Sequence, residues 1–155
     1  MLTYVIEDSP IKAGRLLEFL TLKFPNCPPQ LFGSFQSGLR NVESNAPSLI
    51  VLDMTLPTFD RIPNAREGRL RPLGGYDLMR KMKLKAIPSH VIVVTQLEAF
   101  GEGEEEVSFA EITSRCVREF PDIFLGSVYF DQGDATWPKQ LNALIDKHVG
   151  IGKKC

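Results

Sequence analysis

Acidic side chains end two of the most apolar segments of the sequence. Glu7 and Asp8 follow the apolar run at residues 4–6, and Asp53 follows the run at residues 48–52. If these runs are neighbouring parallel strands, their carboxyl ends bring three carboxylates into one pocket. Carboxylates gathered in this way repel one another, and a hard cation bound to oxygen ligands relieves that repulsion. The residues therefore predict an Mg²⁺ site formed by Glu7, Asp8 and Asp53.

The elements that must position these acids are predicted by apolar runs that alternate with helical patterns. Strands are expected at residues 4–6, 31–35, 48–53, 90–95 and 127–131, and helices at about 10–20, 38–45, 76–84, 102–119 and 134–145. Five such alternations predict an α/β fold, namely a flavodoxin-like, doubly wound, five-stranded parallel sheet of order 2-1-3-4-5 with helices on both faces.

Composition is typical of a single globular domain. The chain has 155 residues, of which 43% are hydrophobic and 24% are charged, and its formal net charge is -1. We expect one domain over residues 1–149 and a loose tail at residues 150–155. The weak net charge argues against direct binding to nucleic acid or to a membrane surface. The start of the chain lacks a basic signal region, and three widely spaced cysteines favour reduced thiols, so we expect a cytoplasmic protein.

The sequence resembles the receiver domain of bacterial response regulators. The matching motifs are Glu7-Asp8, Asp53-Met54-Thr55-Leu56-Pro57, Gly74-Gly75-Tyr76-Asp77-Leu78 and the hydroxyl residue Thr95 at the end of the fourth strand. The resemblance runs in order from the first strand to the last helix. It implies a receiver-like domain of a two-component phosphorelay.

The resemblance also implies a role for each site residue. Asp53 would attack a phosphohistidine or a small phosphodonor and become an acyl phosphate. Asp8, Asp53 and the Thr55 carbonyl would hold Mg²⁺, and Glu7 would act through a water molecule. Thr95 would donate a hydrogen bond to a phosphoryl oxygen.

Two features depart from the family pattern. The family carries a lysine at the end of the fifth strand, and counting back from the predicted helix cap at Asp134 gives Asp131 at that position. A carboxylate there would repel a phosphoryl group, so we expect phosphorylation of Asp53 to be weak or absent. The loop between Pro57 and Gly74 is long and carries four arginines, at Arg61, Arg66, Arg69 and Arg71. It is either a solvated basic loop or a lid whose arginine replaces the missing lysine.

Three functions are compatible with these residues. We favour a non-enzymatic signalling receiver that takes its phosphoryl group from a histidine kinase or a phosphotransfer protein. A phosphorylation-independent pseudo-receiver that binds another signalling protein is the second. An Mg²⁺-dependent phosphohydrolase with an aspartyl nucleophile is the weakest, because Thr55 stands where such enzymes carry a second acid. The arginine-bearing loop and the long segment 95–127 are the predicted partner surface, and a homodimer through that face is an alternative.

Overall fold

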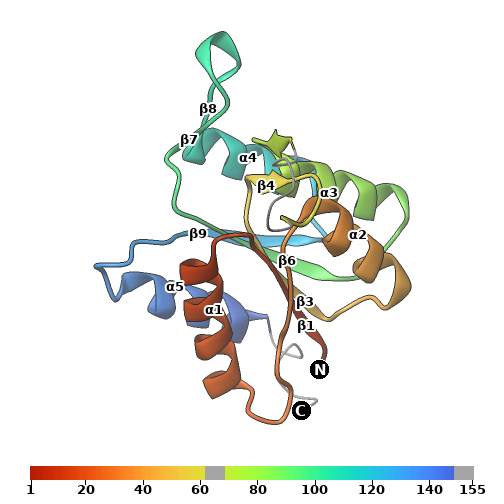
Figure 1. Ribbon diagram of the computed structural model, residues 1–155, viewed down its shortest axis with the longest axis vertical. Helices are drawn as coiled ribbons and strands as arrows, with labels where there is room; N and C mark the ends of the chain where they lie inside the picture. The colour runs from red at the N-terminus through yellow and green to blue at the C-terminus, as the bar shows by residue number, and fades with distance from the viewer. Residues whose placement is uncertain (62–68, 149–155) are drawn as a thin grey trace.

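Five parallel strands form the central sheet of the computed structural model, which describes residues 1–61 and 69–148 (Figure 1). These strands are β1 (Thr3–Ile6), β2 (Gln30–Phe32), β3 (Leu49–Leu52), β6 (His90–Thr95) and β9 (Phe124–Tyr129). Their order is β2-β1-β3-β6-β9, and each neighbouring pair is parallel. The predicted fold class and strand order are therefore confirmed.

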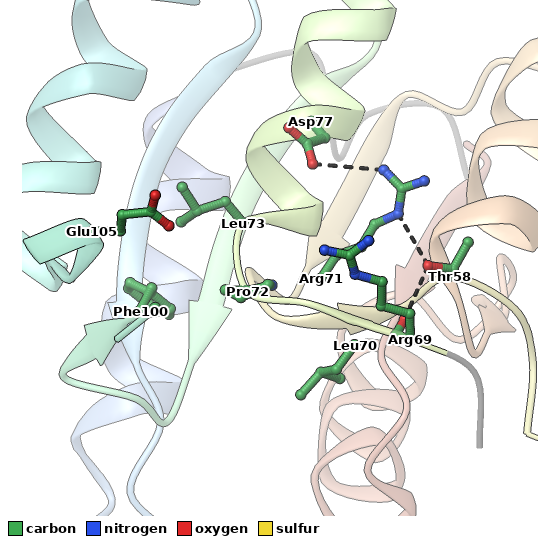
Figure 2. A pocket seen from close by; sticks show the side chains of 10 residues that line it. Thr58, Arg69, Leu70, Arg71, Pro72, Leu73, Asp77, Phe100 and Glu105 are labelled. Atoms are coloured by element: carbon green, nitrogen blue, oxygen red, sulfur yellow. Dashed lines mark hydrogen bonds and ion pairs between the residues drawn. The ribbon is translucent and has the colours of Figure 1, made fainter. Parts of the chain in front are cut away.

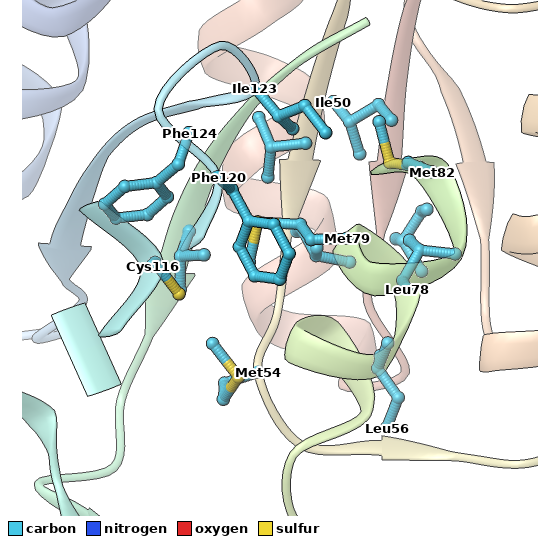
Figure 3. Close-up of a cluster of buried hydrophobic side chains, with 14 of the residues drawn as sticks. Ile50, Met54, Leu56, Leu78, Met79, Met82, Cys116, Phe120, Ile123 and Phe124 are labelled. Atoms are coloured by element: carbon cyan, nitrogen blue, oxygen red, sulfur yellow. The ribbon is translucent and has the colours of Figure 1, made fainter. Parts of the chain in front are cut away.

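Helices cover both faces of this sheet. They are α1 (Pro10–Lys23), α2 (Phe35–Ser44), α3 (Gly74–Leu84), α4 (Phe109–Glu119) and α5 (Thr136–Lys147). Alternate strand residues face opposite layers, as the pleat of a strand requires. Val51 packs with the α1 and α5 side chains Leu16 and Leu141, whereas Ile50 packs with Met79 of α3 and with residues of α4 (Figure 3).

Two short antiparallel hairpins, which the sequence reasoning missed, stand at the carboxyl edge of the sheet. One pairs β4 (Leu56–Pro57) with β5 (Leu70–Arg71). The other pairs β7 (Ala99–Phe100) with β8 (Val107–Ser108), and its tip contains the 3-10 helix η1 (Gly103–Glu105). The second hairpin projects from the body of the molecule next to α4 (Figure 1).

Several predicted boundaries are wrong for local reasons. The helix expected from residue 102 begins only at Phe109, because Gly101 and Gly103 adopt positive φ angles of 84° and 61° and turn the chain into the second hairpin. The second strand ends at Phe32, since the Ser34 side chain accepts the backbone N–H of Ser37 and caps α2. The last strand also lies earlier than predicted and ends at Tyr129.

The remaining expectations concern cysteines, membrane contact and the tail. Cys116 is a buried free thiol, but Cys27 is disulfide-bonded, so the expectation of reduced thiols is wrong for Cys27. No helix within the described residues is long and apolar enough to cross a bilayer. The predicted tail at residues 150–155 lies outside the described residues.

Candidate functional site

Three carboxylates meet where β1 and β3 end. The two strands are paired along their whole length, and the backbone N–H of Asp53 donates to the Ile6 carbonyl at 3.0 Å, so the residues that follow them emerge side by side. One carboxylate oxygen each from Glu7, Asp8 and Asp53 lies within 4.8 Å of the others. The predicted acidic pocket is therefore present.

Glu7 is the buried member of this trio, with 2% of its surface exposed. Its Oε2 accepts the backbone N–H groups of Asp8 at 2.9 Å and Ser9 at 3.1 Å, which fixes the carboxylate at the start of α1. Burial raises the pKa of Glu7 to about 7, and the Asp53 carboxylate adds to the rise. The ammonium of Lys12 opposes that rise. Near neutral pH, Glu7 therefore titrates within the site.

A buried lysine occupies the centre of the acidic pocket, and the sequence reasoning did not identify it. Lys12 Nζ lies 2.5 Å from Glu7 Oε1 and 3.2 Å from Asp53 Oδ1. It also donates to the backbone carbonyl of Val94 at 2.6 Å. An ammonium has three N–H groups, which is enough to direct one toward each of these three oxygens. The Lys12 side chain is 1% exposed, so its charge acts where solvent screening is weak.

Asp53 is held in one orientation by its neighbours. Its Oδ1 accepts the backbone N–H of Met54 at 2.8 Å and also contacts Lys12. Within the described residues, Oδ2 has no hydrogen-bond partner, and 13% of the side chain is exposed. Gly75 packs against this turn, because a Cβ atom there would lie 2.6 Å from the Asp53 carbonyl oxygen. The carboxylate is thus fixed at one oxygen, and the other accepts no hydrogen bond from the described residues.

Arg61 lies on the outer side of the pocket and is paired with Asp8. The distance from Arg61 Nη2 to Asp8 Oδ2 is 3.1 Å, and 53% of the arginine side chain is exposed. Burial is the main reason that the pKa of Asp8 is raised, and Arg61 counteracts it. The neighbouring Asp60 accepts a hydrogen bond from the Ser37 hydroxyl at 2.7 Å, which anchors this segment on α2. An arginine of the long loop therefore contacts the outermost carboxylate of the trio, and its role as a lid stays a prediction.

The other three arginines do not share this position. Arg71 donates to the Thr58 hydroxyl at 3.2 Å, lies 3.7 Å from Asp77, and stacks 4.1 Å from the centre of the Phe35 ring. It therefore fastens the first hairpin to α2 and α3 (Figure 2). Arg69 lies at the edge of the hairpin, where its carbonyl accepts from Thr58. Arg66 lies outside the described residues.

The first hairpin also borders a groove of about 660 Å³. The groove runs between β5, the start of α3 and the second hairpin, and Arg69 and Leu70 line its outer edge (Figure 2). Its lining comprises Thr58, Arg69, Leu70, Arg71, Pro72, Leu73, Asp77, Phe100, Gly101 and Glu105. Both segments that the sequence predicted as a partner surface thus contribute to one concave surface.

The structure locates the remaining predicted residues as follows. Thr95 is buried at the end of β6, and its hydroxyl accepts the backbone N–H of Leu97 at 3.2 Å. The Thr55 hydroxyl donates to the Pro72 carbonyl at 2.9 Å and ties the turn after Asp53 to the segment before α3. Asp131 is exposed, accepts the backbone N–H of Gly133 at 3.0 Å, and is not part of the acidic trio.

A sequence signal for Lys12 does exist. Lys12, Leu16 and Leu20 are spaced four residues apart on α1, and all three are buried. A lysine in register with an apolar helical stripe points toward the sheet rather than toward solvent. Its charge then requires buried partners, which Glu7 and Asp53 supply.

Comparison with solved structures shows that the chain has the fold of a response-regulator receiver domain. The receiver domain of a putative LuxO repressor protein from Vibrio parahaemolyticus superimposes with a TM-score of 0.59 at 17% identity, over 95% of this chain and 88% of that chain. No protein-family model matches the chain.

Two curated relatives cover nearly the whole chain. The protein y4jR of Sinorhizobium fredii is 29% identical over 140 residues, covering 88% of this chain and 91% of the relative. The Detocs response regulatory protein DtcB of Enterobacter cloacae is 33% identical over 147 residues, covering 88% of this chain and 93% of the relative. The chain therefore belongs to the family of the Detocs response regulatory protein DtcB.

Proposed function

We propose that this chain is a receiver-type signalling module in which Asp53 accepts a phosphoryl group from a histidine kinase or a phosphotransfer protein. The observation that supports this proposal is the environment of Asp53. Its carboxylate lies beside those of Glu7 and Asp8, with one oxygen held by the Met54 N–H and the other free of hydrogen bonds from the described residues. A nucleophile needs such a fixed and accessible oxygen.

The residues fit Mg²⁺ as the cofactor. Two oxygens on one Mg²⁺ are at most about 4 Å apart, twice the usual metal–oxygen distance of about 2.1 Å. The trio lies within 4.8 Å, so a small contraction brings its oxygens to that separation. Asp8 and Asp53 would hold the ion directly together with the Thr55 carbonyl, and Glu7 would act through water. When bound, the ion supplies positive charge against the transferring phosphoryl group.

The proposed chemical step uses the free oxygen of Asp53. Oδ2 attacks the phosphorus of a phosphohistidine, an O–P bond forms, and the P–N bond to the histidine breaks. The histidine nitrogen keeps the electron pair and takes a proton from water. Met54 keeps the carboxylate in orientation throughout, and the Thr95 hydroxyl would turn from Leu97 to a phosphoryl oxygen.

A phosphorylation-independent pseudo-receiver is the second candidate. Specific contacts favour it, because Lys12 and Arg61 pair with all three carboxylates. A pocket neutralised by side chains has less need for a cation.

The contacts do not support the phosphohydrolase alternative. Thr55 stands where such enzymes carry a second acid, and its hydroxyl donates to the Pro72 carbonyl. We therefore propose a signalling module rather than an enzyme.

The groove between the two hairpins is the proposed partner surface. It is formed by the two hairpins and the start of α3, and Leu70 is 48% exposed at its edge. The partner would be the phosphodonor or another signalling protein, and a second copy of the chain is the alternative. We also propose that the chain acts in the cytoplasm. Deleting residues 61–70 should leave the domain folded and weaken capture of the cognate kinase, and unchanged capture would exclude this loop.

The primary test is phosphorylation of the purified chain. Intact-mass spectrometry after incubation with acetyl phosphate and Mg²⁺ should detect one added phosphoryl group on the wild type. Asp53→Ala should remove it, whereas Asp60→Ala, which alters a nearby carboxylate outside the trio, should not. A wild type that stays unlabelled, yet binds its partner, would favour the pseudo-receiver.

A further inference from the structure

The packing of α1 against the sheet does not require a charged side chain at position 12. Lys12 shares its helical stripe with Leu16 and Leu20, where an apolar side chain would pack without the cost of burying a charge. Replacing buried ion pairs with apolar residues is often neutral or stabilising in proteins. A lysine at this position therefore indicates a requirement of the site.

The location of the ammonium identifies that requirement. It lies at the carboxyl ends of β1, β3 and β6 together, in contact with Glu7, Asp53 and the Val94 carbonyl. At the end of β9 there is no positive charge, because Asp131 stands there and turns onto Gly133. The pocket thus receives its cation from the first helix instead of the last strand.

We infer that Lys12 is the residue that pairs with the phosphoryl group on Asp53, an inference that rests on the proposed function. Of the three contacts of the ammonium, the one to Asp53 Oδ1 is the longest at 3.2 Å. Phosphorylation of Oδ2 removes the carboxylate charge on which the contact between Lys12 and Asp53 Oδ1 depends. The third N–H of Lys12 then turns to a phosphoryl oxygen, while Glu7 and Val94 keep the other two.

This arrangement removes the electrostatic objection raised by Asp131. Phosphorylation brings about two negative charges into a pocket that holds three carboxylates. A buried ammonium beside the reacting carboxylate offsets part of that charge at short range. The expectation that Asp53 would be poorly phosphorylated assumed that no such cation is present, and Lys12 supplies it.

The test compares matched lysine substitutions on one helix. Lys12→Met should lower the initial rate of labelling by acetyl phosphate at least about tenfold, because a charge-assisted hydrogen bond to the phosphoryl group is lost. Lys23→Met is the control, because Lys23 contacts Asn142 and Asp146 and no residue of the pocket. It should label like the wild type.

A rescue variant separates this role from a structural one. Asp131→Lys restores a lysine at the end of the last strand, so Lys12→Met combined with Asp131→Lys should recover labelling without recovering the urea midpoint. If Lys12→Met does not fold, Lys12→Met with Glu7→Gln removes both buried charges and is compared with Glu7→Gln alone. Equal labelling of that pair, or of Lys12→Met and the wild type, would overturn the inference and leave the proposed function intact. An unlabelled wild type would overturn both.

Discussion

Replacing Lys12 with methionine should destabilise the folded domain substantially. Methionine fills a similar volume on the apolar stripe of α1, so the change mainly removes the ammonium. Glu7 and Asp53 are then left facing each other without the cation that contacts both of them at 2.5 Å and 3.2 Å. Breaking a buried ion pair from one side costs about 3–5 kcal/mol, because the remaining charge keeps its desolvation penalty.

That cost is large enough to measure without ambiguity. Domains of this size have unfolding free energies of about 5–15 kcal/mol, and the urea dependence is about 1–3 kcal/mol per molar. We therefore expect the urea midpoint of Lys12→Met to fall by about 2 M at pH 7. Far-UV circular dichroism measures the unfolding. Lys23→Met, whose side chain is partly exposed, should shift the midpoint far less.

A double-mutant cycle identifies the source of the loss. Glu7→Gln removes the buried carboxylate closest to the ammonium, so adding it to Lys12→Met should recover part of the stability. The two free-energy changes should then be non-additive by about 1–3 kcal/mol. Additive changes, or a loss below about 1 kcal/mol for Lys12→Met, would show that the ion pair does not operate as its geometry indicates.

Three other predictions concern the same pocket. Because the pKa of Glu7 is about 7 when folded and about 4.3 in an unfolded chain, its contribution to stability is present at low pH and is lost as pH rises from about 4 to 7, so Glu7→Gln should flatten the unfolding free energy across that window. Gly75→Ala should displace the Asp53 turn and lower both stability and labelling, since its Cβ would lie 2.6 Å from a backbone oxygen; unchanged labelling would contradict this. Arg61→Gln should tighten Mg²⁺ binding several-fold in calorimetry, because the guanidinium no longer competes for Asp8, and equal affinity would exclude that competition.

The sheet could be predicted because the residues that identify each strand are consecutive in the sequence. Continuous apolar runs such as residues 49–52 and 91–94 identify strands buried on both faces, and the intervening helical patterns require parallel crossovers. Once that order is known, Glu7, Asp8 and Asp53 must lie together, since they follow adjacent strands. The acidic trio therefore follows from topology alone.

The rest depended on contacts that no local pattern specifies. The sequence analysis assigns no role to Lys12, although its spacing to Leu16 places it on the buried stripe of α1. The two hairpins have strands of only two residues, which is too short for any alternation to be recognised. Arg61 was included in the lid hypothesis, but its pairing with Asp8 depends on the anchoring of Asp60 to α2.

Because the ammonium belongs to Lys12 on α1, it also affects the order in which the site can assemble during synthesis. The three acids, Lys12 and its acceptor Val94 all belong to the first 94 residues of the chain. Domains begin to fold as they leave the ribosome, from the amino terminus onward. A lysine on the last strand would delay charge balance until translation was nearly finished, whereas this chain carries both signs of charge before β9 and α5 are made. A nascent chain halted after β6 already contains every charged group of the pocket.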